Sequence, residues 1–224
     1  MRILSVEALP LPEVKVVRYG RFTDQRGYFC EHFRQSDFEK RLTFLDGMPF
    51  VQANESFSRP GTLRGLHFQW NPYVGKLVRT LHGHMVDLVL DIRLGAPTYG
   101  KIIAHDMPAD PHRADNQWIW VPPGFAHGSL FLQETTIEYY CTGEYNPACE
   151  AGISPLARDL DWSLCQPALK KTFDEVAFQT ELISPKDKAG LTLFAWSDDE
   201  RSRHFRYQPF ARAREARPAS RMAG

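Results

Sequence analysis

Two histidine segments offer the residue types that acid–base chemistry needs. Residues 63–69, LRGLHFQ, place Arg64 and His67 three apart in a short apolar run. Residues 121–128, VPPGFAHG, carry His127 behind a proline–glycine turn. Histidine titrates near neutral pH, so either residue could move a proton during a reaction. A histidine in a strand or turn is more often a structural hydrogen-bonding group, and spacing alone leaves both roles open.

A metal site is the second chemistry that the histidines suggest. His82 and His84 are two apart, so in a strand their rings would face the same way, and His127 could add a third ligand. Gly83 between them is typical of a hairpin turn, which would separate the rings. We therefore expect no metal. The sequence also lacks the glycine-rich and Walker motifs of nicotinamide and P-loop proteins, and we expect no cofactor.

Four cations lie near these segments in the sequence: Arg26, Arg64, Lys76 and Arg79. Cations on strands beside glycines suit a diphosphate group. Each of them taken alone fits a surface charge better.

Length and composition are those of a globular protein. The chain has 224 residues, 43% hydrophobic and 24% charged, which fits one large β domain or two small ones. No apolar run approaches the roughly 18 residues of a membrane helix, and the amino terminus does not resemble a signal peptide. The four cysteines form no C-x-x-C pair, so we expect reduced thiols in a cytoplasmic protein.

The net charge is zero but uneven. Residues 201–224 hold seven arginines and one glutamate. Such an end could contact nucleic acid, but it lacks interleaved aromatic residues, and we expect a solvated tail without nucleic-acid binding.

Short strands dominate the predicted elements. Turn residues interrupt them every 8–12 positions, which favours a β-sandwich or β-barrel. One helix is predicted from a Ser36–Glu39 capping box to a point before Gly47. Val86, Leu88, Leu90 and Ile92 alternate with other residues, which predicts a strand with one face in the core. The predicted strands are residues 14–18, 28–33, 50–56, 62–69, 76–82, 84–93, 101–107, 118–121, 129–132 and 135–141.

Taken together, the motifs resemble the dTDP-4-dehydrorhamnose 3,5-epimerase family of metal-independent cupins. The resemblance runs from about Val14 to about Lys188. It rests on seven motifs in order: D-x-R-G-Y-F-x-E at 24–31, Q-x-N-x-S at 52–56, LRGLHFQ at 63–69, GKLVR at 75–79, DIR at 91–93, GFAHG at 124–128 and S-x-K-D at 184–187. One motif alone would be weak evidence, but the ordered set is specific.

The resemblance implies a mainly β, jelly-roll barrel and a homodimer in which an N-terminal strand crosses to the partner. We place the cupin domain at residues 1–190 and a C-terminal extension at 191–224. Strict alternation would put Arg64 and His67 on opposite faces, although the family uses both at its site. The crossing strand, or a bulge at Gly65, could resolve this conflict.

The resemblance also implies residue roles. His67 would be the general base, Asp187 its orienting partner, and Tyr140 the acid on the other face of the sugar. Lys76 would lie by the C4 carbonyl with His127 nearby. The nucleotide base would meet Arg26, Phe29 and Glu31, and the diphosphate and sugar would meet Gln52, Asn54 and Arg64.

The implied chemistry needs no cofactor. A proton beside a ketone is acidic because the resulting anion is an enolate, and a histidine can remove that proton near neutral pH. Inversion then requires a proton from the opposite face of the ring. The expected reaction inverts C3 and C5 of a nucleotide-linked 4-keto-6-deoxyhexose.

The region after Tyr140 departs from the family pattern. Cys141 stands where the family usually has lysine, and the segment up to Pro147 is one residue short, with a single Tyr145 where two aromatics are common. Tyr139 and Tyr145 are therefore alternates for the acid. A C3-only epimerase is the second hypothesis within this enzyme class. A catalytically silent nucleotide-sugar-binding cupin and a metal-dependent cupin oxygenase are the other two.

Overall fold

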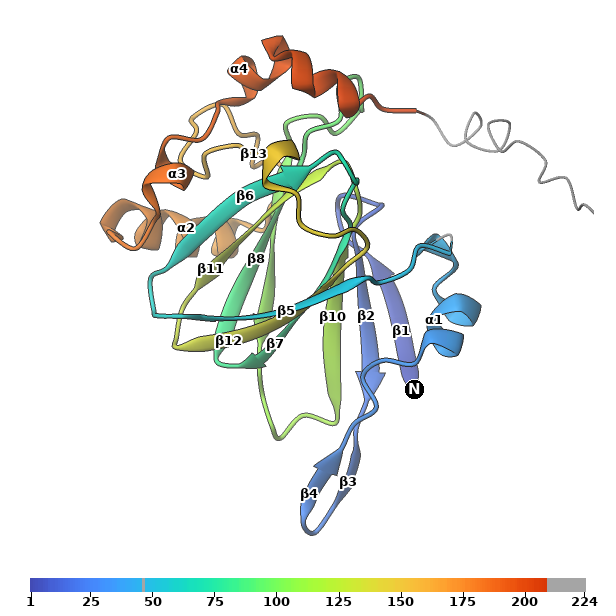
Figure 1. Cartoon of the computed structure of the whole chain (residues 1–224). Helices are drawn as coiled ribbons and strands as arrows, with labels where there is room; N and C mark the ends of the chain where they lie inside the picture. Colours follow the sequence, from blue (N-terminus) through green and yellow to red (C-terminus); the bar gives the residue numbers. More distant parts are fainter. Residues whose placement is uncertain (46, 209–224) are drawn as a thin grey trace, which may run out of the picture.

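Two antiparallel β-sheets face each other in the computed structural model, which describes residues 1–45 and 47–208 (Figure 1). The six-stranded sheet comprises, in spatial order, β1 (Ile3–Ala8), β2 (Lys15–Gly20), β10 (Asp115–Val121), β7 (Lys76–His82), β12 (Thr135–Cys141) and β5 (Gln52–Ser58). The five-stranded sheet comprises β13 (Glu150–Gly152), β6 (Leu63–Gln69), β11 (Phe125–Phe131), β8 (His84–Asp91) and β9 (Ile102–Pro108). A separate hairpin of β3 (Phe22–Asp24) and β4 (Gly27–Phe29) projects from the barrel (Figure 1).

Successive strands often lie in different sheets. β5 and β6 do so, and so do β7 and β8. Gly83 is therefore a crossover between the sheets, and the hairpin interpretation of this position was wrong. Its φ of +85° favours glycine. This alternation of sheets closes the barrel and confirms the jelly-roll type of fold.

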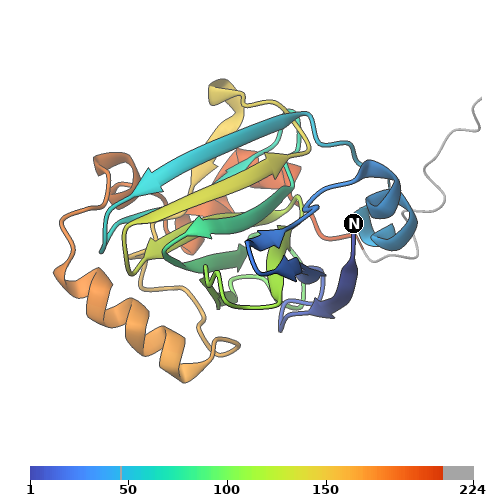
Figure 2. The ribbon, with the colours of Figure 1, turned by 90° about the horizontal axis from the view of Figure 1, so that it is seen from below.

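The space between the sheets holds one apolar core, with Val78, Val89, Ile119 and Phe131 among its members. Further apolar residues are buried on the outer faces of both sheets. A 13-residue helix, α2 (Pro167–Gln179), lies along one side of the barrel and contributes Phe173 to the core outside the five-stranded sheet (Figure 2).

Strand β8 shows the effect of this outer layer. Its residues from Met85 to Asp91 are all buried, so both of its faces are covered rather than the one that alternation predicted. The outward residues Val86, Leu88 and Leu90 pack in the same cluster as Phe173.

The segment after β4 covers the other sheet. It contains α1 (Gln35–Arg41) and the 3₁₀ turn η1 (Thr43–Leu45), and it buries Phe38, Leu42 and Leu45 against Trp118 and Trp120. The helix is where the sequence predicted it, but the capping box was wrong. The N-cap residue is Arg34, without a side-chain cap, and Ser36 lies inside the helix.

The C-terminal segment packs on the barrel rather than leaving it. It contains α3 (Pro185–Lys188), α4 (Leu193–Asp198) and the 3₁₀ turn η3 (Glu200–His204). Trp196 is fully buried, with its ring centroid 4.7 Å from that of Phe68, and Phe205 joins the same cluster. The predicted solvated tail lies largely in residues 209–224, outside the described residues.

Among the described residues, no helix combines the length and apolar character needed to cross a membrane.

Candidate active site

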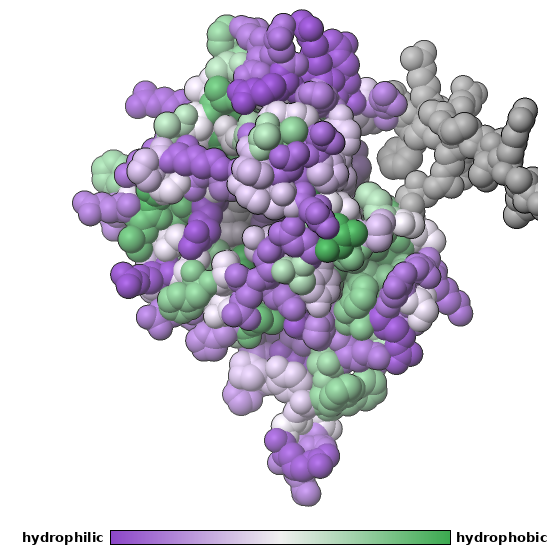
Figure 3. Space-filling model, in the orientation of Figure 1, coloured by the Kyte–Doolittle hydropathy of each residue, from purple (hydrophilic) through white to green (hydrophobic). Residues whose placement is uncertain are grey.

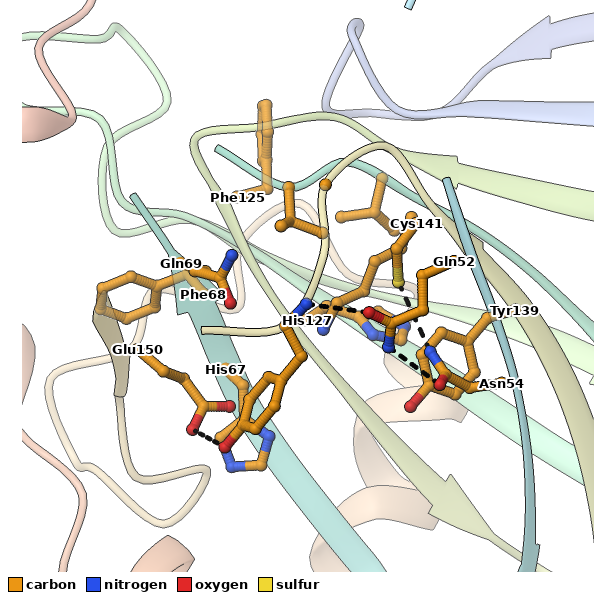
Figure 4. A pocket seen from close by; sticks show the side chains of 15 residues that line it. Gln52, Asn54, His67, Phe68, Gln69, Phe125, His127, Tyr139, Cys141 and Glu150 are labelled. Carbon is orange, nitrogen blue, oxygen red and sulfur yellow. Dashed lines mark hydrogen bonds between the residues drawn. The ribbon is translucent and has the colours of Figure 1, made fainter. Parts of the chain in front are cut away.

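A cavity of about 340 Å³ lies between the two sheets and brings together five of the eleven predicted site residues, namely Gln52, Asn54, His67, Lys76 and His127. Its size is in the range of small-molecule sites. The lining combines polar groups with a few aromatic rings (Figure 4). The five-stranded sheet contributes His67, Gln69, His127 and Glu150 to the lining. The six-stranded sheet contributes Gln52, Asn54, Lys76, Tyr139 and Cys141, and the loop after β12 contributes Tyr145.

His67 and Asp187 form a close pair. His67 Nε2 lies 2.6 Å from Asp187 Oδ1, and the carboxylate is buried. Ser184 caps α3 through its side chain and so fixes the turn that carries Asp187. Burial acts to raise the pKa of the Asp187 carboxyl, but hydrogen bonds from His67 and from the Gly65 amide outweigh it, and the pKa is lowered. An ionised Asp187 keeps a proton on Nε2 and leaves Nδ1 of a neutral His67 free to accept one.

The expected bulge beside His67 is present. His67 pairs with His127 across β6 and β11, whereas Arg64 pairs with Ser129, so three steps on β6 match two on β11. Gly65 has a φ of +106°, and a Cβ there would lie 2.5 Å from Gly128 Cα. Only glycine fits this close approach of two strands.

The bulge does not bring Arg64 into the cavity lining. Its Nε donates to Ser58 Oγ at 3.0 Å, and the residue is exposed. Its charge still acts on the site, because it opposes the effect of burial on the Tyr139 phenol. Arg64 therefore lies beside the cavity, not in its wall.

His127 belongs to a second, more deeply buried histidine–aspartate pair. Its Nε2 lies 2.7 Å from Oδ2 of the fully buried Asp87. His84 pairs separately with Asp106 at 2.5 Å. His84 and His127 thus point to different carboxylates, and the described part of the chain holds no cluster of three or more His, Cys, Asp or Glu arranged for a metal.

Lys76 brings a cation to the cavity wall formed by the six-stranded sheet. It pairs with Cys141 across β7 and β12. Burial lowers the pKa of the Lys76 ammonium, and the nearby acidic groups of Cys141, Glu150 and Asp87 act in the opposite direction. A cation shielded from water in this way interacts strongly with an oxyanion formed nearby.

Tyr140 is placed differently from the prediction. Its ring packs against Phe33, Phe50 and Trp118 on the outer face of the six-stranded sheet. Its hydroxyl lies 3.2 Å from His32 Nε2. Side chains alternate along a strand, so the neighbouring residue points inward, and it is Tyr139 that lines the cavity. The predicted position of Tyr140 in the site is therefore corrected: its hydroxyl lies outside the cavity, and Tyr139, one of the two alternates for the acid, lines the cavity.

Three residues assigned to the nucleotide base do not line this cavity. Arg26 and Phe29 lie in the projecting hairpin, where Arg26 bonds Asp24 and Phe29 is 68% exposed. Glu31, just after the hairpin, bonds Arg34. Within one chain, these residues do not lie in the cavity wall.

Among the lining residues that were not assigned to the site from the sequence, three have polar or ionisable side chains: Gln69, Cys141 and Glu150. Gln69 could have been found, because it shares a face with His67 under strict alternation. Glu150 follows an irregular loop, and no periodic pattern places it.

Comparisons with known proteins identify the family of the chain. A family model described as dTDP-4-dehydrorhamnose 3,5-epimerase matches residues 8–194. The chain belongs to this family. A dTDP-4-dehydrorhamnose 3,5-epimerase of Sinorhizobium fredii is 41% identical over 190 residues, 84% of this chain and 88% of that protein. The Escherichia coli protein of the same name is 34% identical and aligns over 85% of this chain and 95% of its own.

Solved structures agree with this family assignment. The dTDP-6-deoxy-D-glucose-3,5-epimerase of Legionella pneumophila, in complex with dTDP-4-keto-L-rhamnose, superposes with a TM-score of 0.75 at 33% identity, covering 92% of this chain and 99% of that one. A 3'-monoepimerase of Streptomyces bikiniensis, in complex with dTDP-quinovose, gives a TM-score of 0.66 at 28% identity and covers 88% and 89%.

Proposed function

We propose that this protein inverts C3 and C5 of dTDP-4-dehydro-6-deoxyglucose through enolate intermediates. The observation that carries the proposal is the His67–Asp187 pair, at 2.6 Å, whose histidine lines the cavity together with Lys76 and Tyr139. Membership of the epimerase family supports the same reaction. The cavity volume of about 340 Å³ accommodates a sugar ring.

In the proposed mechanism, each inversion removes one proton from the sugar and returns one proton to it. His67 Nδ1 takes the proton from C3, and the electrons of the C–H bond move into the enolate of the C4 ketone. Lys76 stabilises the enolate oxygen, with His127 nearby. The Tyr139 hydroxyl then delivers a proton to C3 from the other side of the ring, and solvent restores both groups. The same steps at C5 complete the reaction. A positioned acid–base pair contributes roughly 10²–10⁴-fold.

Proton NMR in D₂O with dTDP-4-dehydro-6-deoxyglucose tests the proposal. We expect deuterium at both C3 and C5, and loss of both exchanges in His67→Ala. His84→Ala is the matched control, because His84 also pairs with a carboxylate but lies outside the cavity. Exchange at C3 alone would select the C3-only epimerase. Binding without exchange at either carbon would overturn the proposed reaction.

We also propose a homodimer in which the β3–β4 hairpin reaches the partner's cavity. Phe22 is 53% exposed and Phe29 is 68% exposed, which is unusual for a three-residue strand pair unless a partner covers it. Apolar surface gathers beside the base of the hairpin (Figure 3). Arg26, Phe29 and Glu31 would then meet the nucleotide of the other subunit.

Subunit mixing tests the crossing. His67→Ala and a double variant Arg26→Ala/Phe29→Ala are each expected to be nearly inactive. If hairpins cross, a mixed dimer contains one cavity with an intact histidine and an intact hairpin, so mixing restores activity. If each hairpin serves its own chain, mixing restores nothing, and the crossing is wrong.

We place the reaction in the cytoplasm. All four cysteines are free thiols in the structure, which supports a reducing compartment.

A further inference from the structure

The rim of the cavity is a loop held by two glutamines. Residues 142–149, here called the cavity lip, connect β12 to β13 and carry Tyr145. The Tyr145 amide donates to Gln52 Oε1 at 2.8 Å, and the Asn146 amide donates to Gln69 Oε1 at 2.8 Å. Gln69 Nε2 donates back to the Glu144 carbonyl at 2.9 Å. The position of Tyr145 therefore depends on side chains of β5 and β6.

The cavity lip also rests on the turn formed by residues 70–73. Asn146 Nδ2 donates to the Asn71 carbonyl at 2.7 Å, and the Trp70 amide donates to the Cys149 carbonyl at 3.1 Å. Gln69 links the two segments, because its Nε2 also donates to the Pro72 carbonyl at 3.0 Å. A displacement of this turn would therefore displace the cavity lip.

The C-terminal segment in turn holds the 70–73 turn. The Tyr73 hydroxyl donates to the His204 carbonyl at 2.9 Å. The ring of His204 stacks on Trp70, with centroids 5.6 Å apart and planes at 12°. Tyr73 also packs edge-on against the buried Phe205, at 5.7 Å. These contacts come from residues past 194, where the match to the family model ends.

We propose that residues 200–205 are a positioning element for the reaction, which acts through the 70–73 turn on the cavity lip and on Tyr145. His204 and Tyr73 are the positioning residues. Neither lines the cavity, and both are connected to it through hydrogen bonds that converge on Gln69 and Asn146. Residues 200–205 thus hold the lip, and with it Tyr145, in place at the rim of the cavity.

Hydrogen exchange measured by mass spectrometry tests this without any reference to catalysis. We expect Tyr73→Phe to raise the exchange rate of amides in peptides spanning 142–149 about fivefold, the order that one net hydrogen bond provides. Tyr99→Phe is the matched control, because the Tyr99 hydroxyl also donates to a C-terminal carbonyl, that of Leu193 at 3.2 Å. Tyr99 takes part in none of the hydrogen bonds that hold the lip described above. Equal exchange of the lip in both variants and the wild type would overturn the proposal.

A second pair of variants separates positioning from general stability. His204→Ala removes the ring that stacks on Trp70, whereas His204→Phe keeps a flat ring there. We expect faster lip exchange in the alanine variant and recovery in the phenylalanine variant, with unchanged exchange in β8. Uniformly faster exchange throughout the chain, or no recovery with phenylalanine, would count against a specific effect on the lip.

The activity arm rests on the proposed function. In Tyr73→Phe we expect KM for the dTDP sugar to rise severalfold and the ratio of C5 to C3 exchange to fall, while Tyr99→Phe matches the wild type. If the wild-type protein has no epimerase activity, the proposed function is wrong. The hydrogen-exchange measurement then still tests whether residues 200–205 hold the lip. If the wild type is active and Tyr73→Phe speeds hydrogen exchange in the lip without changing KM or the ratio of C5 to C3 exchange, residues 200–205 have no role in the reaction.

Discussion

Tyr139 and Tyr140 are neighbours on β12 that face opposite sides of the six-stranded sheet. Tyr139 lines the cavity, whereas Tyr140 packs among Phe33, Phe50 and Trp118. Burial raises the pKa of both phenols, so burial does not distinguish them. The face of the sheet to which each side chain points does distinguish them, and it makes Tyr139 the candidate proton donor.

Substitution of these two tyrosines should have unequal effects. Tyr139→Phe removes the candidate acid and is expected to lower kcat roughly 10²–10⁴-fold. Tyr140→Phe removes a hydroxyl on the other side of the sheet and should change kcat by less than about threefold, an amount within the effect of one weak hydrogen bond. Steady-state kinetics of both variants decides the matter. A larger loss in Tyr140→Phe would reverse our correction.

Asp187→Asn should prevent His67 from acting as the base without weakening substrate binding. Asparagine keeps the shape but no longer holds the proton on Nε2, and loss of such an orienting carboxylate costs up to about 10⁴-fold in kcat. The KM for substrate should change little, because Asp187 lies behind His67 and not in the cavity lining. Kinetics together with dTDP titration checks both expectations, and a variant with kcat near the wild-type value would argue against His67 as the base.

The fall of kcat/KM at alkaline pH should follow the loss of the proton from the Lys76 ammonium. Burial lowers the pKa of its ammonium below the ordinary 10.5, so the cation is lost earlier as pH rises. Tyr139 titrates above its ordinary 10.0 and should not set this fall. We expect kcat/KM to fall on the alkaline side below pH 10.5 and Lys76→Arg to move this fall to higher pH. An identical fall in both proteins would assign it to another group.

Gly65→Ala should destabilise the fold more than a glycine change without steric conflict. A Cβ at Gly65 would meet Gly128 Cα at 2.5 Å and would also need a φ of +106°. We expect a loss of at least about 2 kcal/mol in the free energy of unfolding. Gly95→Ala is the control, because its φ is +83° but its Cβ would have no neighbour within 4 Å. Urea denaturation of the two variants should show the larger loss for Gly65→Ala.

Acid should remove one surface contribution to stability. The Lys101 ammonium and the Ser163 side chain lower the pKa of Asp161 from 3.8 to about 2. A carboxyl whose pKa is lower in the folded state stabilises the protein above the unfolded value, and this contribution disappears as pH falls from about 4 to 2. The urea midpoint should therefore fall less between pH 6 and pH 3 in Asp161→Asn than in the wild type. An equal fall would show that the contact is too solvent-exposed to matter.

The sequence predicted the architecture through short, regularly interrupted strands and predicted the His67 segment through residue types. It did not show the direction of Tyr140, because alternation on β12 assigns opposite faces without saying which is inward. The tertiary surroundings decide this. Trp118 forms an apolar layer outside the sheet with Phe33, Phe38 and Phe50, and this layer accepts one ring, whereas the cavity accepts the other.

Other features had no local signal. The N-cap lies at Arg34 and not at the residue of the capping box. Asp37, in the first turn of this helix, bonds the amino group of Met1, a contact between distant segments that the local pattern does not show. The burial of both faces of β8 depends on helices that follow it by more than 70 residues. The division of the chain at residue 190 stays a prediction, although Trp196 and Phe205 share a core with Phe68.

The crossing of the chain between sheets also sets the stereochemistry that the cavity can support. His67 and His127 belong to one sheet, whereas Lys76 and Tyr139 belong to the other. Facing sheets pack about 10 Å apart, a spacing set by side chains along their whole length. A sugar ring between them has room to lie with one face toward each sheet. The two-sidedness required for inversion is thus a property of the sandwich itself, and the surrounding loops are free to change which sugar enters.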